Sequence, residues 1–379
     1  MKLVFWLCTI LLAYHIVFYG VFLSLFNKIF RKKRVFPKVA DEQLPSIEIV
    51  CAAYNEENII EEKIKSFLLL DYPKDKIRML VISDDSTDRT NEIVQRYASE
   101  NVELIIQKPR AGKQSAQNMV VPLLKADYIL STDANTILRP DSVRIMAEVM
   151  LSDSRIGLAS GTLILDDMNG DSGEGLFWKY ETWLKQQDSD FYSIIVSNGS
   201  LFMIRRDLFK IVDNSSADDF ERALVTLHSS YIAVNVPEAL ASEPVTGIVP
   251  EEIGRKIRII TQEWNTIARN YELLNFFKYP QVSFLLISHK ILRWLFFVFV
   301  IGIFVSSLLL ANILFYRVLF YIQVICYLVG GIELYLQSRK KHIPGAGFPA
   351  YSIGMFYASI IAFKNFIVRK NFGIWNPTR

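Results

Sequence analysis

The sequence predicts an α/β domain that is flanked by membrane helices. Three observations support this class. Within residues 45–275, short β-favouring runs alternate with segments of helical periodicity, which is typical of βαβ units and a largely parallel sheet. Near both ends, apolar runs of about 20 residues are long enough to cross a bilayer as helices. Hydrophobic residues make up 51% of the 379 residues, and the excess is concentrated in these end segments.

The charge and cysteine content argue against several classes of protein. A formal net charge of +3 is too small to indicate a nucleic-acid partner. Cys8, Cys51 and Cys326 lie far apart in apolar surroundings, so their spacing predicts neither a disulfide framework nor a zinc site. The sequence has no Walker-type loop and no GxGxxG pattern, which disfavours P-loop NTPases and dinucleotide dehydrogenases.

The first apolar run predicts a membrane anchor. It covers residues 3–26, which is longer than a signal-peptide core, and it lacks an obvious small-x-small cleavage site. Basic residues crowd 28–34 and only Lys2 precedes the run, so the positive-inside rule places the N-terminus outside and the following domain in the cytoplasm. A cleaved signal peptide is the alternative and would place that domain outside. We therefore expect a transmembrane helix at 1–27 in the inner or plasma membrane, followed by a basic linker at 28–44.

The central domain begins at Pro45, where the linker ends. Strands are expected at 47–53, 77–83, 102–107 and 128–132, and helices are expected at 57–70, 88–99 and 114–125. A strand start at 160–163, an aromatic-rich helix at 175–187 and a strand at 236–243 are expected to follow. In a parallel sheet of this kind, ligands bind beyond the carboxyl ends of the strands.

Polar clusters follow four consecutive strands of this domain. They are Tyr54-Asn-Glu56, Asp84-Asp85, Arg110 to Lys113 and Asp133-Ala-Asn135. Any one of them could be a turn or a helix cap, but all four are expected on the same edge of the sheet. Acidic residues there could bind a base or ribose, a lysine suits a phosphate, and a metal could bridge a diphosphate. The clusters together predict a nucleotide diphosphate site.

The last of these clusters is the candidate metal site. The strand expected at 128–132 leads into Asp133, and alternation along a strand would point Asp133 and Asn135 the same way. Their oxygens suit Mg2+ or Mn2+, because such cations commonly combine one or two protein ligands with substrate phosphates. The alternative is that Asp133 caps the next turn, since Asp and Asn readily bond their own backbone.

Four motifs of the domain resemble the family 2 glycosyltransferases. They are Val50-Cys-Ala-Ala-Tyr-Asn-Glu-Glu57, Leu70-Asp-Tyr-Pro-Lys-Asp-Lys76, Val81-Ile-Ser-Asp-Asp-Ser-Thr-Asp88 and Arg110-Ala-Gly-Lys113. The similarity covers nearly the whole chain and is closest to the membrane-embedded, processive branch that includes hyaluronan, chitin and cellulose synthases. The resemblance implies a GT-A fold, a nucleotide-sugar donor, usually a UDP-sugar, and a Mg2+ or Mn2+ cofactor.

The resemblance also implies roles for residues at this edge of the sheet. Tyr54 and Glu56 would line the nucleotide pocket. Asp84 would hold the base, and Lys113 would contact the nucleotide. Asp133 would be the first acid of the family's Asp-x-Asp metal motif.

Two motifs depart from the family's pattern. The metal motif reads Asp-Ala-Asn, so Asn135 supplies a neutral oxygen and leaves Asp133 as the main metal ligand. The family's Gln-x-x-Arg-Trp is represented by Arg255-Lys-Ile-Arg258 and then Ile259. Arg258 could bind a diphosphate oxygen through its forked donors, whereas the missing Trp weakens the case for a long polysaccharide product. A basic helix face is the alternative for this segment.

The stretch Ala217-Asp-Asp-Phe220 contains the candidate catalytic base. Transfer with inversion needs a group that takes the proton of the acceptor hydroxyl, and a carboxylate within hydrogen-bond reach can do so. Adjacent acids at a helix start are also common, because the helix dipole favours them. The resemblance implies that Asp219 is the base, with Asp218 as the alternative.

Two further segments concern the acceptor. The helix expected at 175–187 carries Trp178, Tyr180 and Trp183, which could stack on sugars but are at helical spacing more often core residues. Asn198 to Arg206 resembles the family's segment along the acceptor channel.

The C-terminal part is expected to return to the membrane. Residues 282–293 form an amphipathic stretch suited to the interface, and 294–337 holds two apolar runs that are each long enough to span. Residues 346–368 are expected to be interfacial or re-entrant, with a third C-terminal transmembrane helix as the alternative. Residues 369–379 are expected to form a cytoplasmic tail. Within it, Trp375 and Arg379 resemble a short gating segment that closes over the bound nucleotide in related enzymes.

The sequence as a whole predicts a membrane-bound inverting glycosyltransferase. It would transfer a sugar from a nucleotide sugar, with UDP as the expected nucleotide, to a polysaccharide or membrane-associated acceptor in cell-surface glycan synthesis. One alternative is a single-sugar transferase that acts on a lipid-linked acceptor. The other is a non-catalytic membrane subunit that binds a nucleotide sugar.

Overall fold

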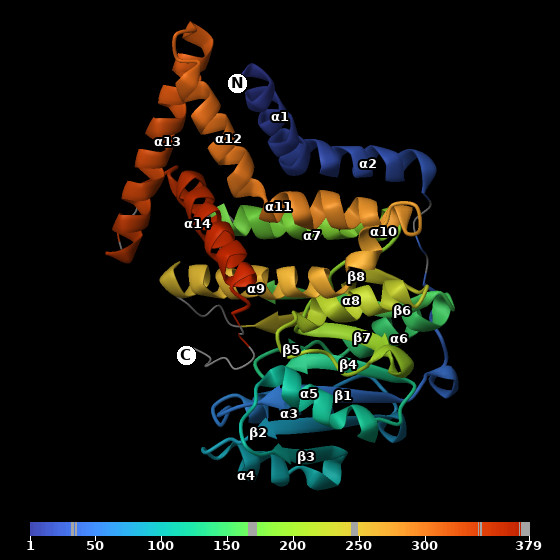
Figure 1. Cartoon of the computed structure of the whole chain (residues 1–379). Helices are drawn as coiled ribbons and strands as arrows, with labels where there is room; N and C mark the ends of the chain where they lie inside the picture. Colours follow the sequence, from blue (N-terminus) through green and yellow to red (C-terminus); the bar gives the residue numbers. More distant parts are fainter. Residues whose placement is uncertain are drawn as a thin grey trace.

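The computed structural model shows an α/β domain with a group of long helices along one side (Figure 1). It describes the whole chain except residues 32–33, 35, 166–172, 244–248, 340, 342, 371 and 373–379. The predicted gating residues Trp375 and Arg379 therefore lie outside the described residues.

The sheet of the domain is mixed and mostly parallel. Its strands are Ile47–Ala53 (β1), Ile77–Asp84 (β2), Val102–Gln107 (β3), Tyr128–Asp133 (β4), Ile137–Leu138 (β5), Ile156–Leu165 (β6), Leu201–Arg205 (β7) and Ile232–Glu243 (β8). They are ordered β3-β2-β1-β4-β7-β6-β8-β5. The pairs from β3 to β4 and the pair β6–β8 are parallel, whereas β7 runs antiparallel to β4 and β6, and β5 to β8. The predicted α/β class is confirmed. The antiparallel strand pairs all lie on the side of the sheet that begins with the β4–β7 pair.

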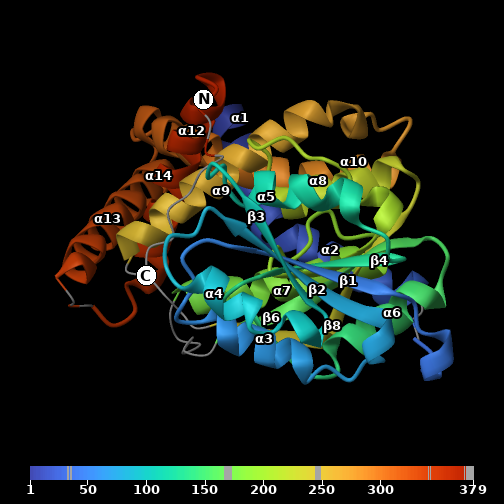
Figure 2. The same ribbon diagram turned by 90° about the horizontal axis from the view of Figure 1, so that it is seen from below.

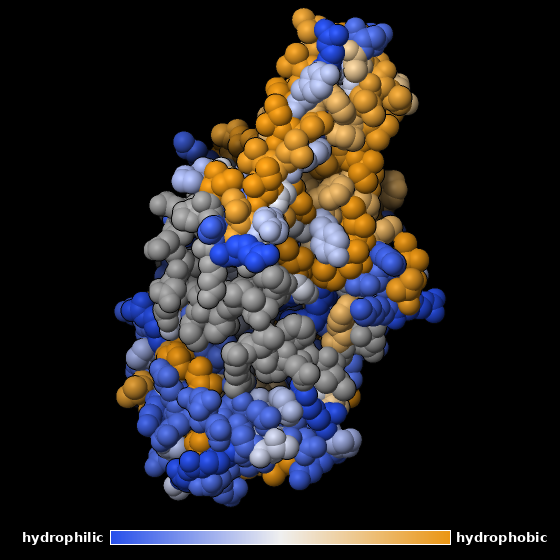
Figure 3. All heavy atoms as spheres, turned by 90° about the vertical axis from the view of Figure 1, so that its left-hand side faces the viewer, coloured by the Kyte–Doolittle hydropathy of each residue, from blue (hydrophilic) through white to orange (hydrophobic). Residues whose placement is uncertain are grey.

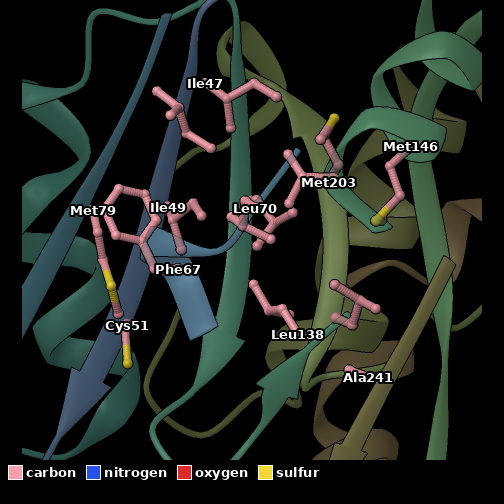
Figure 4. Packing of buried hydrophobic residues seen from close by; sticks show 14 of the residues in the cluster. Ile47, Ile49, Cys51, Phe67, Leu70, Met79, Leu138, Met146, Met203 and Ala241 are labelled. Carbon is pink, nitrogen blue, oxygen red and sulfur yellow. The ribbon is translucent and has the colours of Figure 1, made fainter. Parts of the chain in front are cut away.

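Helices cover both faces of the sheet and bury its apolar side chains. They are Ile60–Leu68 (α3), Thr90–Gln95 (α4), Lys113–Val120 (α5), Ser142–Ser152 (α6), Gly173–Phe191 (α7), Asp218–His228 (α8) and Val249–Arg269 (α9). Figure 2 shows α3 and α6 on one face and α5 and α8 on the other. Because strand residues alternate between faces, Ile49 and Cys51 pack with Phe67 of α3 (Figure 4), while Val50 packs in the cluster that contains α5.

Several predicted boundaries move for identifiable reasons. The helix expected at 114–125 ends at Val120, because Pro122 lies in the short 3-10 turn that follows. The helix expected from Asp88 begins at Thr90 with Arg89 at its N-cap position, while the Asp88 carboxylate accepts a hydrogen bond from the backbone N–H of Thr90 at 3.0 Å. Ser160 lies within β6, whereas the sequence placed it at a strand start. These shifts leave the order of the elements unchanged.

Apolar helices from both ends of the chain gather on one side of the domain. They are Lys2–Ala13 (α1), Tyr19–Phe30 (α2), Pro280–Leu285 (α10), Leu292–Trp294 (α11), Phe296–Leu309 (α12), Leu314–Ser338 (α13) and Gly347–Ile367 (α14), with single π-helical turns at Tyr14–Phe18 and Leu286–Ile291. Figure 3 shows hydrophobic surface over these helices and hydrophilic surface over the far end of the α/β domain.

Among the described residues, three helices are long and apolar enough to cross a membrane. They are Lys2–Phe30, Leu314–Gln337 and Gly347–Ile367, and a bent pair that joins Pro280–Trp294 to Phe296–Leu309 at 57° is a fourth candidate. The segment expected to be interfacial or re-entrant, Gly347–Ile367, is thus long and apolar enough to span, as are Lys2–Phe30 and Leu314–Gln337, whereas Phe296–Leu309 qualifies only together with Pro280–Trp294. The division of the chain into spanning and interfacial segments stays a prediction.

Candidate active site

A cluster of one lysine and two aspartates lies at the carboxyl end of β4. Lys113, the first residue of α5, places its Nζ 2.6 Å from Oδ1 of Asp133. The same Nζ lies 3.6 Å from Oδ2 of Asp218, the first residue of α8, and donates to the Gly199 carbonyl at 3.4 Å. Burial alone would lower the pKa of Lys113, but Asp133 and Asp218 outweigh it and raise that pKa. The fold thereby joins three predicted site residues from separate segments.

The surroundings of Asp133 fit a cation shared with a substrate phosphate. Glu243, at the end of β8, is close enough for Asp133 to affect it, because burial and then the charge of Asp133 raise the pKa of Glu243. Among the described residues, no three His, Cys, Asp or Glu side chains form a group that could hold a metal. Asp133 alone, or with Glu243, fits a Mg2+ or Mn2+ that completes its shell with phosphate oxygens and water.

Asn135 does not share the strand geometry that the sequence predicted for it. β4 ends at Asp133, and Asn135 lies in the turn that follows. Alternation along a strand therefore does not align Asn135 with Asp133. The alternation argument does not extend to Asn135, and its role as a metal ligand stays a prediction.

Asp84 holds the loop that precedes α5. Oδ1 of this buried carboxylate accepts hydrogen bonds from the Gln107 side chain at 2.5 Å and from the Ala111 backbone N–H at 2.8 Å. Its Oδ2 accepts from the backbone N–H of Gly112 at 2.8 Å, and Gly112 has a φ of +94°, which favours glycine. Both oxygens of Asp84 are thus engaged by this loop, and a contact with a base, as the resemblance implies, would compete with these bonds.

Tyr54 and Arg110 form a stack at the same edge of the sheet. The guanidinium carbon of Arg110 lies 3.5 Å from the centre of the Tyr54 ring, which is close for a cation–π contact. Glu56, two residues further along, follows β1, and its backbone N–H donates to the Thr90 hydroxyl at 2.7 Å. Asp85 follows β2 with a positive φ of 58° and a partly exposed side chain. The predicted rim residues therefore do lie at neighbouring strand ends.

The two acids at the start of α8 have different surroundings. Asp218 faces Lys113, whereas Asp219 lies against the loop before β7, where a Cβ built on Gly199 would be 3.6 Å from Oδ2 of Asp219. Burial, followed by the negative charges of Asp218 and Glu263, raises the pKa of Asp219 to about 7. A carboxyl group with a pKa near neutrality is well matched to accepting a proton at physiological pH.

Further cations lie around Asp219. Lys290 pairs with Glu263 at 2.6 Å, and both residues influence the pKa of Asp219. Lys185, from α7, donates to the Ser160 hydroxyl at 2.8 Å, and its pKa is affected by Asp219. Neither Lys185 nor Lys290 was predicted as a site residue. The only sequence feature that sets Lys185 apart is that it is a charged residue within the aromatic-rich helix.

Arg258 belongs to the same electrostatic cluster. Burial and then the neighbouring Arg255 lower its pKa, while Asp133 and the two acids of α8 oppose that shift. The side chain of Arg258 is partly buried, and Ile259, at the position of the family's Trp, is 36% exposed. The structure thus brings Arg258 within electrostatic reach of the acids at β4 and α8.

The aromatic side chains of α7 pack against the N-terminal helix. A Cβ built on Gly20 would lie 2.7 Å from a ring carbon of Trp183, and the Tyr180 hydroxyl donates to the Ile16 carbonyl at 2.9 Å. These contacts favour the interpretation of Tyr180 and Trp183 as packing residues over that of sugar platforms. Ser200, which donates to Asp133 at 3.1 Å, and Glu243 were also missed, because their spacing carries no pattern of its own.

Comparison with known proteins finds a family profile that matches most of the α/β domain. Residues 48–213 match the profile of glycosyl transferase family 2. The chain is 26% identical over 226 residues to the probable glycosyltransferase YdaM of Bacillus subtilis, which is 53% of this chain and 51% of that protein. It is 29% identical over 126 residues to the poly-beta-1,6-N-acetyl-D-glucosamine synthase of Staphylococcus aureus, which is 33% of this chain and 30% of that protein. The chain thus spans about half of the first relative and under a third of the second.

A solved structure extends the likeness to nearly the whole chain. The mannosyltransferase PcManGT from Pyrobaculum calidifontis, in complex with GDP-Man and Mn2+, superposes with a TM-score of 0.72 and 19% sequence identity. The match covers 97% of this chain and 100% of that one. It shows that the two proteins share a fold, including the helices outside the α/β domain.

Proposed function

We propose that this chain, whose residues 48–213 match the profile of glycosyl transferase family 2, is a membrane-bound, inverting enzyme that uses a nucleotide sugar. The observation that carries the proposal is the cluster at the end of β4, where Lys113 lies 2.6 Å from Asp133 and 3.6 Å from Asp218, next to the partly buried Asp219. Such a site combines a cation for phosphate, a carboxylate for a metal and a carboxyl group for proton transfer.

The nucleotide sugar is proposed to bind along the edge formed by β1, β2 and β4. The stacked Tyr54 and Arg110 offer a flat surface and a cation for the nucleotide, with Glu56 beside them. Asp84 contributes by fixing the loop that presents Lys113, and the base itself would meet Asp84 only in competition with this loop. Lys113 and Arg258 supply positive charge for the diphosphate.

In the proposed reaction, the acceptor oxygen attacks the anomeric carbon of the donor sugar from the face opposite the diphosphate. The bond from that carbon to the diphosphate oxygen breaks, and its electron pair leaves with the nucleoside diphosphate. Asp219 takes the proton of the acceptor oxygen, and Lys113 and Arg258 stabilise the developing negative charge. A Mg2+ or Mn2+ on Asp133, when bound, would add positive charge at the departing diphosphate.

Membrane attachment and orientation are part of the proposal. The three helices able to span, and the apolar surface over them in Figure 3, support attachment through both ends of the chain. The basic residues at 28–34 favour a cytoplasmic α/β domain with access to nucleotide sugars. The Staphylococcus aureus relative, a poly-beta-1,6-N-acetyl-D-glucosamine synthase by name, supports a cell-surface glycan as one product class.

Transfer of a single sugar to a lipid-linked acceptor is the second candidate. Ile259 stands where processive relatives have a Trp, so the aromatic platform for a growing chain is missing at this position. Sizing of the products made from a radiolabelled donor would separate the two, because a processive enzyme gives long chains and a single transferase gives one discrete product.

The proposed function can be tested by donor hydrolysis with the purified full chain. UDP- and GDP-sugars would be screened with Mn2+, with Mg2+ and with chelator; GDP-sugars are included because the mannosyltransferase of similar fold was solved with GDP-Man. We expect metal-dependent release of one nucleoside diphosphate, lost in Asp133→Ala. Binding of a nucleotide sugar without any turnover, in the presence of a range of acceptors, would instead support a non-catalytic subunit.

A further inference from the structure

Lys185 differs from the other cations that surround Asp219. Lys290 has a carboxylate oxygen of Glu263 at 2.6 Å, and Lys113 has one of Asp133 at the same distance. Among the described residues, the hydrogen bond of Lys185 goes to the neutral Ser160 hydroxyl, at 2.8 Å, and the side chain forms no ion pair. Burial lowers the pKa of Lys185 to about 8, which reflects the cost of holding this ammonium group without a close anion.

The position of Lys185 connects it to the proposed acceptor side. The Ser160 hydroxyl that binds Lys185 also accepts the backbone N–H of Asn198 at 2.8 Å. The next residue, Gly199, packs against the candidate base, because a Cβ atom added to it would lie 3.6 Å from Asp219. Lys185 is therefore linked to the candidate base through one hydroxyl and one short loop.

Lys185 also lies in the layer between the sheet and the apolar helices. Its helix, α7, binds β8 through Ser189, whose hydroxyl accepts the Asn235 backbone N–H at 2.9 Å, and binds α2 through the Asn27 side chain, which donates to the Gln187 carbonyl at 2.9 Å. Figure 1 shows α7 between the layer of α2 and the strands. An acceptor that approaches Asp219 from the membrane side meets this layer first.

A neutral acceptor would leave the charge of Lys185 without a partner. Sugar hydroxyls are well served by Ser160 and by backbone groups, and they do not compensate an ammonium group in partly buried surroundings. A phosphate does so, and lysine binds phosphate as a point charge. The negative charges of Asp219 and Glu181 raise the pKa of Lys185 but form no ion pair with it among the described residues.

We propose that Lys185 binds an anionic phosphate oxygen of the acceptor, so that this enzyme glycosylates a phosphomonoester in preference to a neutral sugar chain. This inference rests on the proposed function. A phosphate oxygen forms the new bond to the anomeric carbon, the bond to the donor diphosphate breaks with its electron pair, and any proton on the acceptor phosphate passes to Asp219. The product is a glycosyl phosphodiester, and Lys185 selects the acceptor by charge.

The test uses the full chain in detergent micelles, with the donor identified by the hydrolysis screen. Four acceptors are compared: farnesyl monophosphate, farnesol, inorganic phosphate and a neutral oligosaccharide. We expect transfer to farnesyl monophosphate at least about tenfold faster than to farnesol or the oligosaccharide. Faster transfer to farnesyl monophosphate than to inorganic phosphate identifies the acceptor as a lipid phosphate, and the opposite order identifies it as a soluble phosphate. Equal or faster transfer to the neutral acceptors overturns the inference.

Variants of Lys185 assign the selectivity to this residue. Lys185→Met should lower the ratio of transfer to farnesyl monophosphate over farnesol about tenfold or more, and Lys185→Arg should retain most of it, because the charge is kept. Lys179→Met changes an exposed lysine on the same helix and should leave the ratio unchanged. An unaltered ratio in Lys185→Met contradicts the inference. Donor hydrolysis by the wild type separates the outcomes: its absence refutes the proposed function, whereas hydrolysis without phosphate preference refutes the role of Lys185 alone.

Discussion

Replacing each acid at the start of α8 by asparagine separates their roles through the pH dependence of transfer. The pKa of Asp219 is raised to about 7, first by burial and then by the negative charge of Asp218. With this pKa, the ionised fraction of Asp219 rises from about 9% at pH 6 to about 91% at pH 8, and the rate of transfer to a hydroxyl acceptor should rise about tenfold with it. An aspartate with an ordinary pKa would already be ionised over this range and would give a flat profile.

The two substitutions have different expected effects on this profile. Asp219→Asn removes the base, so with a hydroxyl acceptor the dependence near pH 7 should disappear and kcat should fall by about 10² to 10⁴. Asp218→Asn removes a neighbouring negative charge, so the pKa of Asp219 falls and the rise in rate moves to lower pH. Because burial is the larger cause and remains, the rise should still occur above the ordinary pKa range of aspartate.

The assay is the steady-state release of nucleoside diphosphate at saturating donor and acceptor, across pH 5 to 9. Nucleotide binding by calorimetry serves as the control that both variants keep a formed site. A persistent rise near pH 7 in Asp219→Asn would show that another group is the base. If Asp218→Asn loses more than a hundredfold while Asp219→Asn stays active, the base is Asp218. An unshifted profile in Asp218→Asn refutes the assigned electrostatic cause.

Three further predictions concern the metal, the nucleotide loop and the packing of the sheet. Asp133→Ala should abolish the part of nucleotide binding that depends on Mn2+, measured by calorimetry with and without the metal, and a retained Mn2+ effect would place the metal elsewhere. Asp84→Asn should weaken donor binding at least about tenfold, because charge-assisted bonds of about 1.5–3 kcal/mol each hold the loop before α5; an unchanged Kd would contradict this role. Gly161→Ala should lower the free energy of unfolding by about 1–3 kcal/mol, since the new methyl would overlap the Leu201 side chain and lie 2.8 Å from the Ala239 carbonyl oxygen, whereas Gly254→Ala, with nothing within 4 Å, should not. Equal melting temperatures of the two variants would refute this.

The sequence predicts the strand ends of the site well, because each depends on a short local pattern. Asp133 and Lys113 were identified as polar residues that follow apolar strands, and the fold brings them 2.6 Å apart. Strand alternation does not reach Asn135, because β4 ends two residues earlier, at Asp133. The signal that ends the strand is the turn at Ala134, which the alternation of residue types does not reveal.

The remainder of the site depends on contacts across long separations in the chain. Glu243 reaches Thr136 from a strand more than 100 residues later, and Lys185 reaches Ser160 across the segment that joins β6 to α7. The residue types alone, a glutamate ending a strand and a lysine within a helix, carry no period or motif. Such pairings become visible only when the antiparallel half of the sheet and the packing of α7 are known.

The layer that holds Lys185 is fixed to the apolar helices by buried charges. Asp188 of α7 accepts a hydrogen bond from the Tyr19 hydroxyl of α2 at 2.6 Å and also contacts His289, while Glu181 binds Arg293 at 2.7 Å. Removing one partner of a buried pair leaves the other charge uncompensated and costs about 3–5 kcal/mol, so these contacts strongly disfavour sliding or rotation of α7. Because α7 also carries Lys185, the same contacts hold the acceptor side of Asp219 at a constant height relative to the apolar helices. If the transfer assays identify a lipid phosphate as the acceptor, a cation held at a constant height relative to the apolar helices would match the fixed depth of that phosphate in a bilayer.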